Sequence, residues 1–260
     1  MSQTNVMVKE IPVNPFYRKM SVYLYYIDGL LIDTGPKINR YSLIPFFKSI
    51  KPKQVALTHH HTDHVGMVPW LAFYQQSTIY CHPNMMSLIT KDINHSWYKK
   101  VFKQEQKSLI KAYPKVINTS NFTFQPIETL GHTYDHVCLY EQNEGWLFTG
   151  DLYVTPHPKV SLQGESITEY IDAIESLLQL NFTKVFCGHQ GAVNHGREML
   201  KEKLNYLKET KFKVKQLHDL GYSDQEIVKE LFPGRVNLEI FTFGSFSRIN
   251  FVRSCYQERV

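Results

Sequence analysis

Short apolar runs alternate with segments of helical periodicity along most of this 260-residue chain. Runs of about four to eight apolar, β-branched or aromatic residues are typical of strands, and an apolar residue at every third or fourth position is typical of a helix. The sequence predicts strands at residues 6–13, 20–27, 30–33, 55–57, 77–81, 121–127, 136–140, 146–149 and 184–187. It predicts helices at residues 40–50, after the loop that follows 57 to about 74, over most of 84–115, and at 166–180 and 196–218. Strands and helices that alternate in two halves predict an α/β (α+β) fold.

Local signals fix some of the boundaries of these elements. Asp28-Gly29 between two apolar runs predicts a tight hairpin turn. Ser166 precedes a helical pattern, and Ser223 with Glu226 three residues later has the spacing of a capping box. The last part of the chain therefore begins a new short helix after residue 222.

Composition limits the class of protein without naming its function. Hydrophobic residues make up 43% and charged residues 20%, which is the balance of a globular protein large enough for one domain or for a domain with an appendage. The net charge of +5 favours an anionic substrate or surface but does not require one. The four cysteines form no Cys-x-x-Cys pair, so we expect reduced thiols. With no signal-peptide pattern and no long apolar run, a cytoplasmic location without a membrane span is the simplest expectation.

The stretch with the most chemistry is Val55-Ala56-Leu57-Thr58-His59-His60-His61-Thr62-Asp63-His64. A short buried strand runs directly into a histidine-rich loop, which contains a His-x-His-x-Asp-His pattern. Imidazole and carboxylate are common ligands of divalent transition metals, and alternate residues of an extended segment face the same side. His59 and His61 could therefore bind one ion, with Asp63 and His64 facing a second. The alternative is a solvated histidine-rich loop.

Three later strand ends each place one further candidate ligand beside a glycine. They are His132 after Gly131, Asp151 after Gly150, and His189 after Gly188. Each alone would more often be a structural residue. Together with the first loop they supply enough nitrogen and oxygen donors for two metal ions, for which zinc is the default and iron or manganese would also fit.

In order and spacing, these motifs resemble those of the metallo-β-lactamase superfamily, from about residue 20 to about residue 195. The resemblance implies a four-layer αββα sandwich with two metal ions at its edge. It assigns His59, His61 and His132 to one metal, Asp63, His64 and His189 to the other, and Asp151 to a bridging position. The run from Gly131 through Asp135-His136 is similar to the LACTB2-like and glyoxalase II-like branch.

A dinuclear site predicts hydrolysis, because water between two cations becomes a hydroxide nucleophile near neutral pH and the cations polarise the substrate. We expect a small-molecule substrate with an ester, thioester or lactone bond, and Asp63 as the catalytic residue that orients the nucleophile or passes a proton to the leaving group. His61 argues against the iron relatives that reduce oxygen, which generally have glutamate there. A mononuclear iron dioxygenase of persulfides shares these ligands and remains an alternative.

Four further residues are candidates for supporting roles. Asp33 ends a buried strand and is either a turn acid or a carboxylate that orients a ligand histidine, and the family resemblance favours the second interpretation. His136 is either a substrate-side or ligand-supporting residue or a locally bonded strand histidine. Tyr153 and His195 are candidates for substrate contacts.

Two segments could modify the site. Residues 84–115 include Trp97-Tyr98-Lys99-Lys100 and could form a substrate wall or a partly exposed helix. Residues 196–218 are basic, with seven lysines and arginines against three glutamates. We predict a metallo-β-lactamase domain at 1–200 and a small, mainly helical domain at 201–260, for which a winged helix is one candidate architecture. Its basic helix is either an exposed face or a surface for nucleic acid, which would make the protein an endoribonuclease of the LACTB2-like type.

Overall fold

Two β-sheets follow one another in the chain. The structure is a computed structural model that describes residues 6–14, 17–95 and 108–257. Within these residues, the strands of the first sheet lie in chain order: β1 (Met7–Asn14), β2 (Tyr17–Ile27), β3 (Leu30–Ile32), β4 (Gln54–Ala56), β5 (Thr78–Cys81) and β6 (Ile110–Ala112). The pairs β1–β2 and β2–β3 are antiparallel, and β3 to β6 are parallel.

The second sheet also keeps chain order. Its described strands are β7 (Ile117–Asn118), β8 (Thr123–Glu128), β9 (Val137–Glu141), β10 (Trp146–Gly150), β11 (Lys184–Cys187) and β12 (Gly191–Val193). Only the pair β10–β11 is parallel among these strands. Both β10 and β11 thus point their carboxyl ends, where Asp151 and His189 follow, to the same edge of the sheet.

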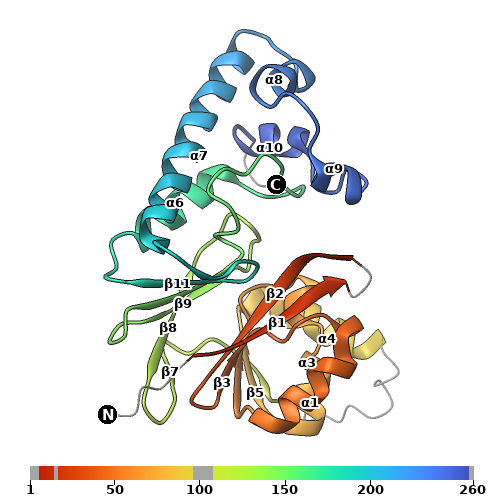
Figure 1. Cartoon of the computed structure of the whole chain (residues 1–260), viewed down its shortest axis with the longest axis vertical. Coiled ribbons are helices and arrows are strands. Elements are labelled where there is room, and N and C mark those ends of the chain that lie inside the picture. Colours follow the sequence, from red (N-terminus) through yellow and green to blue (C-terminus); the bar gives the residue numbers. More distant parts are fainter. Residues whose placement is uncertain (1–5, 15–16, 96–107, 258–260) are drawn as a thin grey trace. The chain divides into compact units, whose positions relative to one another are not determined.

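The two sheets lie face to face (Figure 1), and aromatic and aliphatic side chains of both sheets form one buried cluster between them. Tyr25 of β2 contacts Phe148 and Phe186 of the second sheet, with ring centroids 5.3 Å away in both cases. Leu30 and Ile32 point into this layer, whereas Leu31 between them points to the other face of the first sheet. Because both faces are covered, β3 is apolar at every position rather than alternating.

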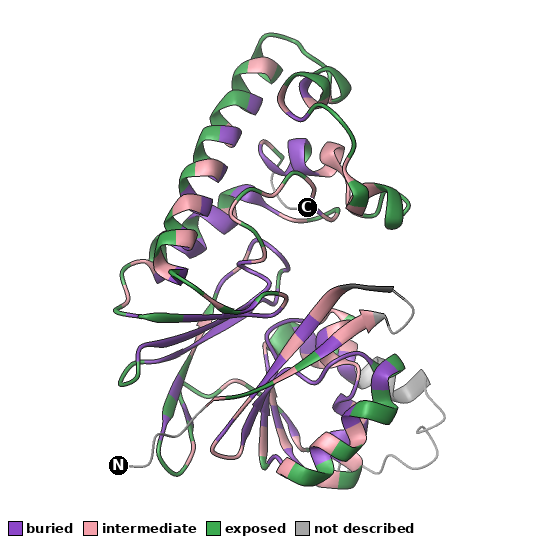
Figure 2. Cartoon of the chain, in the orientation of Figure 1, coloured by how far each residue is buried: buried purple, intermediate pink, exposed green. Residues whose placement is uncertain are grey.

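Helices cover the outer face of the first sheet. The described ones are η1 (Lys37–Asn39), α1 (Arg40–Ile50), α2 (Thr62–Val65), α3 (Val68–Trp70), the π-helical turn η2 (Leu71–Gln75) and α4 (Pro83–His95). Phe47 of α1, Trp70 of α3 and Met85 of α4 are buried against this face. Figure 2 shows exposed residues on the outward side of α1, whose Leu43 and Phe47 are buried, which is the pattern of a helix packed on a sheet.

The chain divides into two compact units. The first contains Met1–Glu128, Asp135–Val154 and Phe182–Asn194, and the second contains Thr129–Tyr134, Thr155–Asn181 and His195–Val260. The described helices of the second unit are α6 (Ile167–Leu177), α7 (Gly196–Asp219), α8 (Asp224–Leu231), α9 (Asn237–Phe241) and α10 (Arg248–Ser254). Among the described residues, no helix has both the length and the apolar character that crossing a bilayer demands.

Most predicted elements are present. The sandwich with C-terminal helices is confirmed, as are the Ser166 cap of α6 and the capping box of Ser223 and Glu226 on α8. One prediction is wrong: residues 110–112 belong to a strand, β6, because they pair with β5 and bury Ile110. Trp97–Lys100 lie outside the described residues. The domain boundary at residue 200 and the winged-helix comparison stay predictions.

Candidate metal centre

The histidine-rich loop of residues 57–67, called the metal loop below, follows the carboxyl end of the parallel strand β4. β4 ends at Ala56, and the chain then extends to His61, which caps the short helix α2. The backbone N–H groups of His64 and Val65 both donate to the His61 carbonyl oxygen, at 2.9 and 3.0 Å. This tight turn carries Asp63 in its first turn and brings His64 back toward the strand end.

Glycine at position 66 serves close packing rather than a sharp turn. Its φ of −58° is ordinary for a helix. A Cβ there would lie 2.5 Å from the backbone nitrogen of Lys37 and 2.9 Å from the Gly35 oxygen. The metal loop therefore lies directly on the backbone of the Gly35–Lys37 segment.

Two groups of candidate ligands form at this edge. In the first, the donor atoms of His59, His61 and Asp151 lie within 4.8 Å of one another. In the second, the donor atoms of Asp63, His64 and His189 do so as well. Each group combines imidazole nitrogen with carboxylate oxygen, the donor set of zinc and similar divalent ions.

Asp151 lies between the two groups. Its Oδ2 is 3.8 Å from Nε2 of His59, in the first group, and 3.2 Å from Nε2 of His189, in the second. Its Oδ1 is 3.4 Å from Nε2 of His64. Gly188 makes this approach possible, because a Cβ at that position would lie 2.6 Å from Asp151 Oδ1. A carboxylate so placed can serve both groups.

The Asp33 carboxylate orients the imidazole of His64 directly and that of His59 through Thr58. This buried carboxylate accepts from Nδ1 of His64 at 2.8 Å, from the Thr58 backbone N–H at 2.8 Å and from the Thr58 hydroxyl at 2.9 Å. The Thr58 oxygen also lies 3.0 Å from Nδ1 of His59, so it accepts from that ring while it donates to Asp33. In their neutral forms, both histidines then carry the proton on Nδ1 and the lone pair on Nε2. The backbone of Asp33 is left-handed, with φ of 59°, a conformation that aspartate tolerates better than most residues.

The donor chemistry fits a bound cation. His64 Nε2 is buried and has no hydrogen-bond partner among the described residues, although the carboxylates of Asp63 and Asp151 lie 3.9 and 3.4 Å from it. His189 donates from Nδ1 to the Ser21 carbonyl oxygen at 2.6 Å, which likewise leaves its Nε2 toward Asp63 and Asp151. Ligand histidines are usually held in this way by a partner on the second nitrogen.

Charges at the site are strongly coupled. Burial alone would lower the pKa of His64, but the carboxylates of Asp151, Asp33 and Asp63 raise it to about 10. Burial would raise the pKa of Asp151, but His189 and His64 hold it well below its usual range. The pKa of His189 is raised too, by Asp151 against the effect of burial. Without metal, therefore, protons on the imidazoles balance the buried carboxylates.

A family model described as metallo-beta-lactamase superfamily matches residues 20–189, which is more than half of the chain. The chain belongs to this superfamily. The predicted family and its His-x-His-x-Asp-His motif are thus confirmed, and the match and the site together support a metal-dependent hydrolase.

Individual relatives carry more specific names. A hydroxyacylglutathione hydrolase of Hamiltonella defensa is 28% identical, with 62% of this chain and 57% of that protein aligned. An atrochrysone carboxyl ACP thioesterase of Aspergillus fumigatus is 33% identical over 47% of this chain and 26% of that protein. This chain thus spans little more than half of the first relative and about a quarter of the second. A beta-lactamase domain protein from Burkholderia ambifaria has the same fold, with a TM-score of 0.68 at 15% identity over 97% of this chain and 87% of that one.

The remaining predicted ligand, His132, belongs to the second unit. It follows Gly131, and its Nδ1 lies 3.0 Å from Oε1 of Glu165. Sequence reasoning did not single out Glu165, because nothing in the pattern around it relates it to a residue so far away in the chain. The order of the family motifs is what assigns His132 to the metal site.

A second carboxylate–histidine pair also escaped the sequence analysis. His60 lies between two candidate ligands, and its Nδ1 is 2.9 and 3.0 Å from the two oxygens of Asp135. Asp135 is fully buried, whereas the His60 side chain is 28% exposed. The Asp-His sequence at 135–136 was the available signal, but it drew attention to His136 instead.

The other predicted supporting residues have varied surroundings. His136 is buried, and its Nε2 accepts from the backbone N–H of Asp151 at 3.2 Å. Tyr153 is also buried, and its carbonyl oxygen accepts from the Cys187 thiol. His195 is exposed in the second unit and precedes α7. Substrate contacts for these three residues stay predictions.

The basic helix predicted at 196–218 is α7, but most of its charges are engaged within the second unit. Arg197 donates to the carbonyl oxygens of Leu178 and Leu180, and Lys211 donates to Thr168. Lys208 and Lys213 pair with glutamates, and Lys203 lies over the Tyr170 ring. Of these five side chains, Lys208 and Lys213 are paired with carboxylates. Nucleic-acid binding by the helix stays a prediction.

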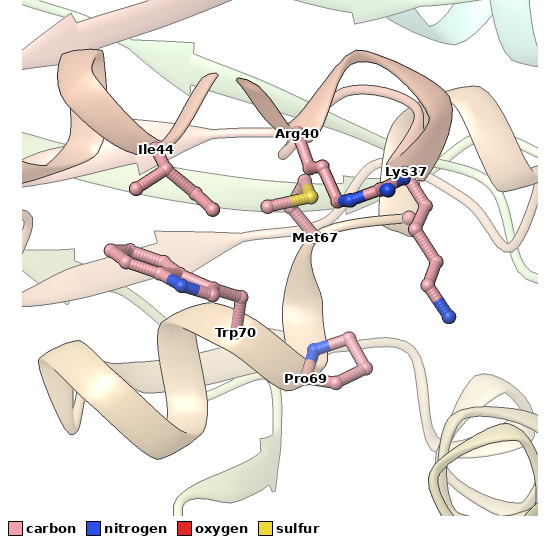
Figure 3. Close-up of a pocket in the computed structure, with 7 residues that line it drawn as sticks. Lys37, Arg40, Ile44, Met67, Pro69 and Trp70 are labelled. Atoms are coloured by element: carbon pink, nitrogen blue, oxygen red, sulfur yellow. The ribbon is translucent and has the colours of Figure 1, made fainter. Parts of the chain in front are cut away.

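A separate shallow cleft lies on the helical side of the first unit (Figure 3). It is lined by Lys37, Arg40, Ile44, Gly66, Met67, Pro69 and Trp70. None of the candidate metal ligands described above lines this cleft. It is therefore distinct from the metal centre, although Gly66 and Met67 belong to the metal loop.

Proposed function

We propose that this chain hydrolyses ester or thioester bonds with two divalent metal ions, most simply zinc. The observation that carries the proposal is the carboxylate of Asp151, which lies within 4 Å of imidazoles from both ligand groups. A bridging carboxylate is the arrangement expected of a two-metal site. A single ion would leave about half of these donor atoms unused.

The ligand assignment combines the two groups with the family resemblance. His59, His61 and His132 would hold one ion, Asp63, His64 and His189 would hold the other, and Asp151 would be available to both. Their nitrogen and oxygen donors suit zinc, and iron or manganese is compatible with the same set.

Bound divalent ions supply an acidified water molecule and polarise the substrate oxygen. The residues of the chain supply orientation and proton transfer. Asp33 holds His64 directly and His59 through Thr58, so these rings keep their Nε2 lone pairs aimed into the site. Asp63 is partly exposed, with 19% of its side chain accessible, and lies on the first turn of α2. Its carboxylate accepts the proton of the attacking water and delivers it to the leaving group.

The choice of bond rests on the relatives. A hydroxyacylglutathione hydrolase and an ACP thioesterase are both named for the cleavage of a thioester. We therefore propose an acyl thioester as the first substrate class, with oxygen esters and lactones next. A thiolate leaves more readily than an alkoxide, so Asp63 contributes less to thioester cleavage than to ester cleavage.

Metal content and activity test this proposal together. The full chain, purified without added metal and then reconstituted with zinc, is analysed by plasma mass spectrometry beside the Asp63→Ala and His132→Ala variants. We expect close to two zinc ions per chain, fewer in both variants, and hydrolysis of a thioester panel that a chelator abolishes. Folded protein that takes up no metal would overturn the proposal, and about one tightly held iron with oxygen consumption on persulfides would replace it with the dioxygenase.

A further inference from the structure

Glu165 and His132 form a buried pair within the second unit. Oε1 of Glu165 lies 3.0 Å from Nδ1 of His132, and the two side chains are 8% and 6% exposed. A carboxylate oxygen accepts and does not donate, so Nδ1 of His132 carries the proton. The lone pair of the ring is then on Nε2, the atom with which His132 would bind a metal.

The backbone around the pair is equally constrained. The Ser166 N–H donates to the Gly131 carbonyl oxygen at 2.9 Å, and the Ser166 hydroxyl caps α6 by accepting from the backbone N–H of Glu169. Gly131 has φ of 127°, and a Cβ there would lie 2.7 Å from the backbone nitrogen of Tyr170. The Gly131–His132 segment therefore packs on the first turn of α6. Glu165 directly precedes Ser166, the N-cap of that helix.

We propose that Glu165 is a positioning residue that selects the tautomer and the ring orientation of His132 for metal binding. This inference rests on the proposed function, in which His132 is a ligand. The same chemistry occurs in the first unit, where Asp33 holds Nδ1 of His64 and the Ser21 carbonyl oxygen holds Nδ1 of His189. Glu165 gives His132 the same kind of partner.

Substitutions at Glu165 separate this role from a simple structural pair. Glu165→Ala removes the acceptor and lets the His132 ring rotate and change tautomer. We expect the affinity for one of two zinc ions to fall by about 10- to 100-fold, the range typical when a partner of a ligand histidine is lost. Glu165→Gln keeps a carbonyl oxygen that can accept from Nδ1, so its loss should be about tenfold or less.

Metal affinity is measured by chelator competition on the full chain, and the visible spectrum of the cobalt-substituted protein reports ligand geometry without relying on activity. Glu175→Ala is the matched control, because Glu175 lies on α6 and pairs with Lys208 at the surface. It should bind metal as the wild type does. Glu165→Ala should add nothing to the loss already caused by His132→Ala, since the two residues act through one ring.

Three results would overturn the inference. The first is wild-type affinity and cobalt spectrum in Glu165→Ala or, if that variant does not fold, in Glu165→Gln. The second is a full additional loss from Glu165→Ala in the His132→Ala background, which would mean a structural effect independent of the ring. The third is wild-type metal binding by His132→Ala, which would remove His132 from the ligand set and so identify the proposed function as the step that failed.

Discussion

Replacing Asp33 should separate the stability of the fold from the strength of metal binding. Its carboxylate is buried and accepts three hydrogen bonds, two from Thr58 and one from His64. In Asp33→Ala, the fixed donors Thr58 N–H and His64 Nδ1–H lose their acceptor, whereas the Thr58 hydroxyl can turn. Each unsatisfied buried donor costs about 1–3 kcal/mol, and a left-handed alanine adds about 1 kcal/mol, so the sum is about 3–7 kcal/mol.

Asp33→Asn should behave differently. Asparagine tolerates the left-handed backbone, and its oxygen still accepts from the Thr58 N–H, so we expect a stability loss of only about 1–2 kcal/mol. Its amide group, however, donates where the carboxylate accepted. His64 must then move its proton to Nε2, the nitrogen meant for the metal. We expect metal affinity to fall by about 10- to 100-fold.

Urea unfolding of the metal-free protein, followed by circular dichroism, gives the stability of each variant. Zinc titration against a chelator gives the affinity. Because a domain is stable by only about 5–15 kcal/mol, Asp33→Ala should be close to unfolding while Asp33→Asn remains folded. Our reasoning is refuted if Asp33→Asn binds zinc as tightly as the wild type, or if both variants lose the same stability.

Three further predictions concern the same unit. Gly188→Ala should weaken metal binding in a folded protein, because its Cβ would lie 2.6 Å from Asp151 Oδ1 and must displace that carboxylate; unchanged zinc content would contradict this. The pKa of His64 is raised to about 10, so a metal must displace a proton from this ring. Zinc affinity should therefore rise with pH up to about that value, and binding should release protons. Calorimetry in buffers of different ionisation enthalpy measures this release. His60→Ala should cost about 1–3 kcal/mol, because it removes one hydrogen-bond partner of the buried Asp135 carboxylate. The loss should shrink in a His60→Ala/Asp135→Leu double variant, and an equal loss in the double variant would argue against the pair.

The sequence predicted the features that depend on residues close to one another along the chain. The strand before His59, the glycines before Asp151 and His189, and the capping box at Ser223 are local patterns with a local physical cause. The resemblance to a family then supplied the order in which the ligands are used. Each of these predictions depends on neighbours within a few positions.

What the sequence did not predict depends on contacts between distant segments. Glu165 and Asp135 are ordinary acids in the sequence, and only the folded chain brings them to His132 and His60. The strand at 110–112 is set by its pairing with β5, which overrides the helical appearance of its surroundings. The charge of α7 was visible, but the partners of its basic side chains on other segments were not.

The packing of the metal loop on the segment after β3 has a dynamic consequence. Thr34 donates to the His64 carbonyl oxygen from its backbone N–H at 2.7 Å and from its hydroxyl at 2.8 Å, and it accepts from the Met67 N–H at 3.1 Å. These bonds join the loop to the edge of the sheet rather than leaving it as a flap. The amide hydrogens involved should therefore exchange with solvent only when the sheet itself opens. A relative that acquires a new substrate can thus be expected to change the segments around this edge and to leave the motion of the metal loop as it is.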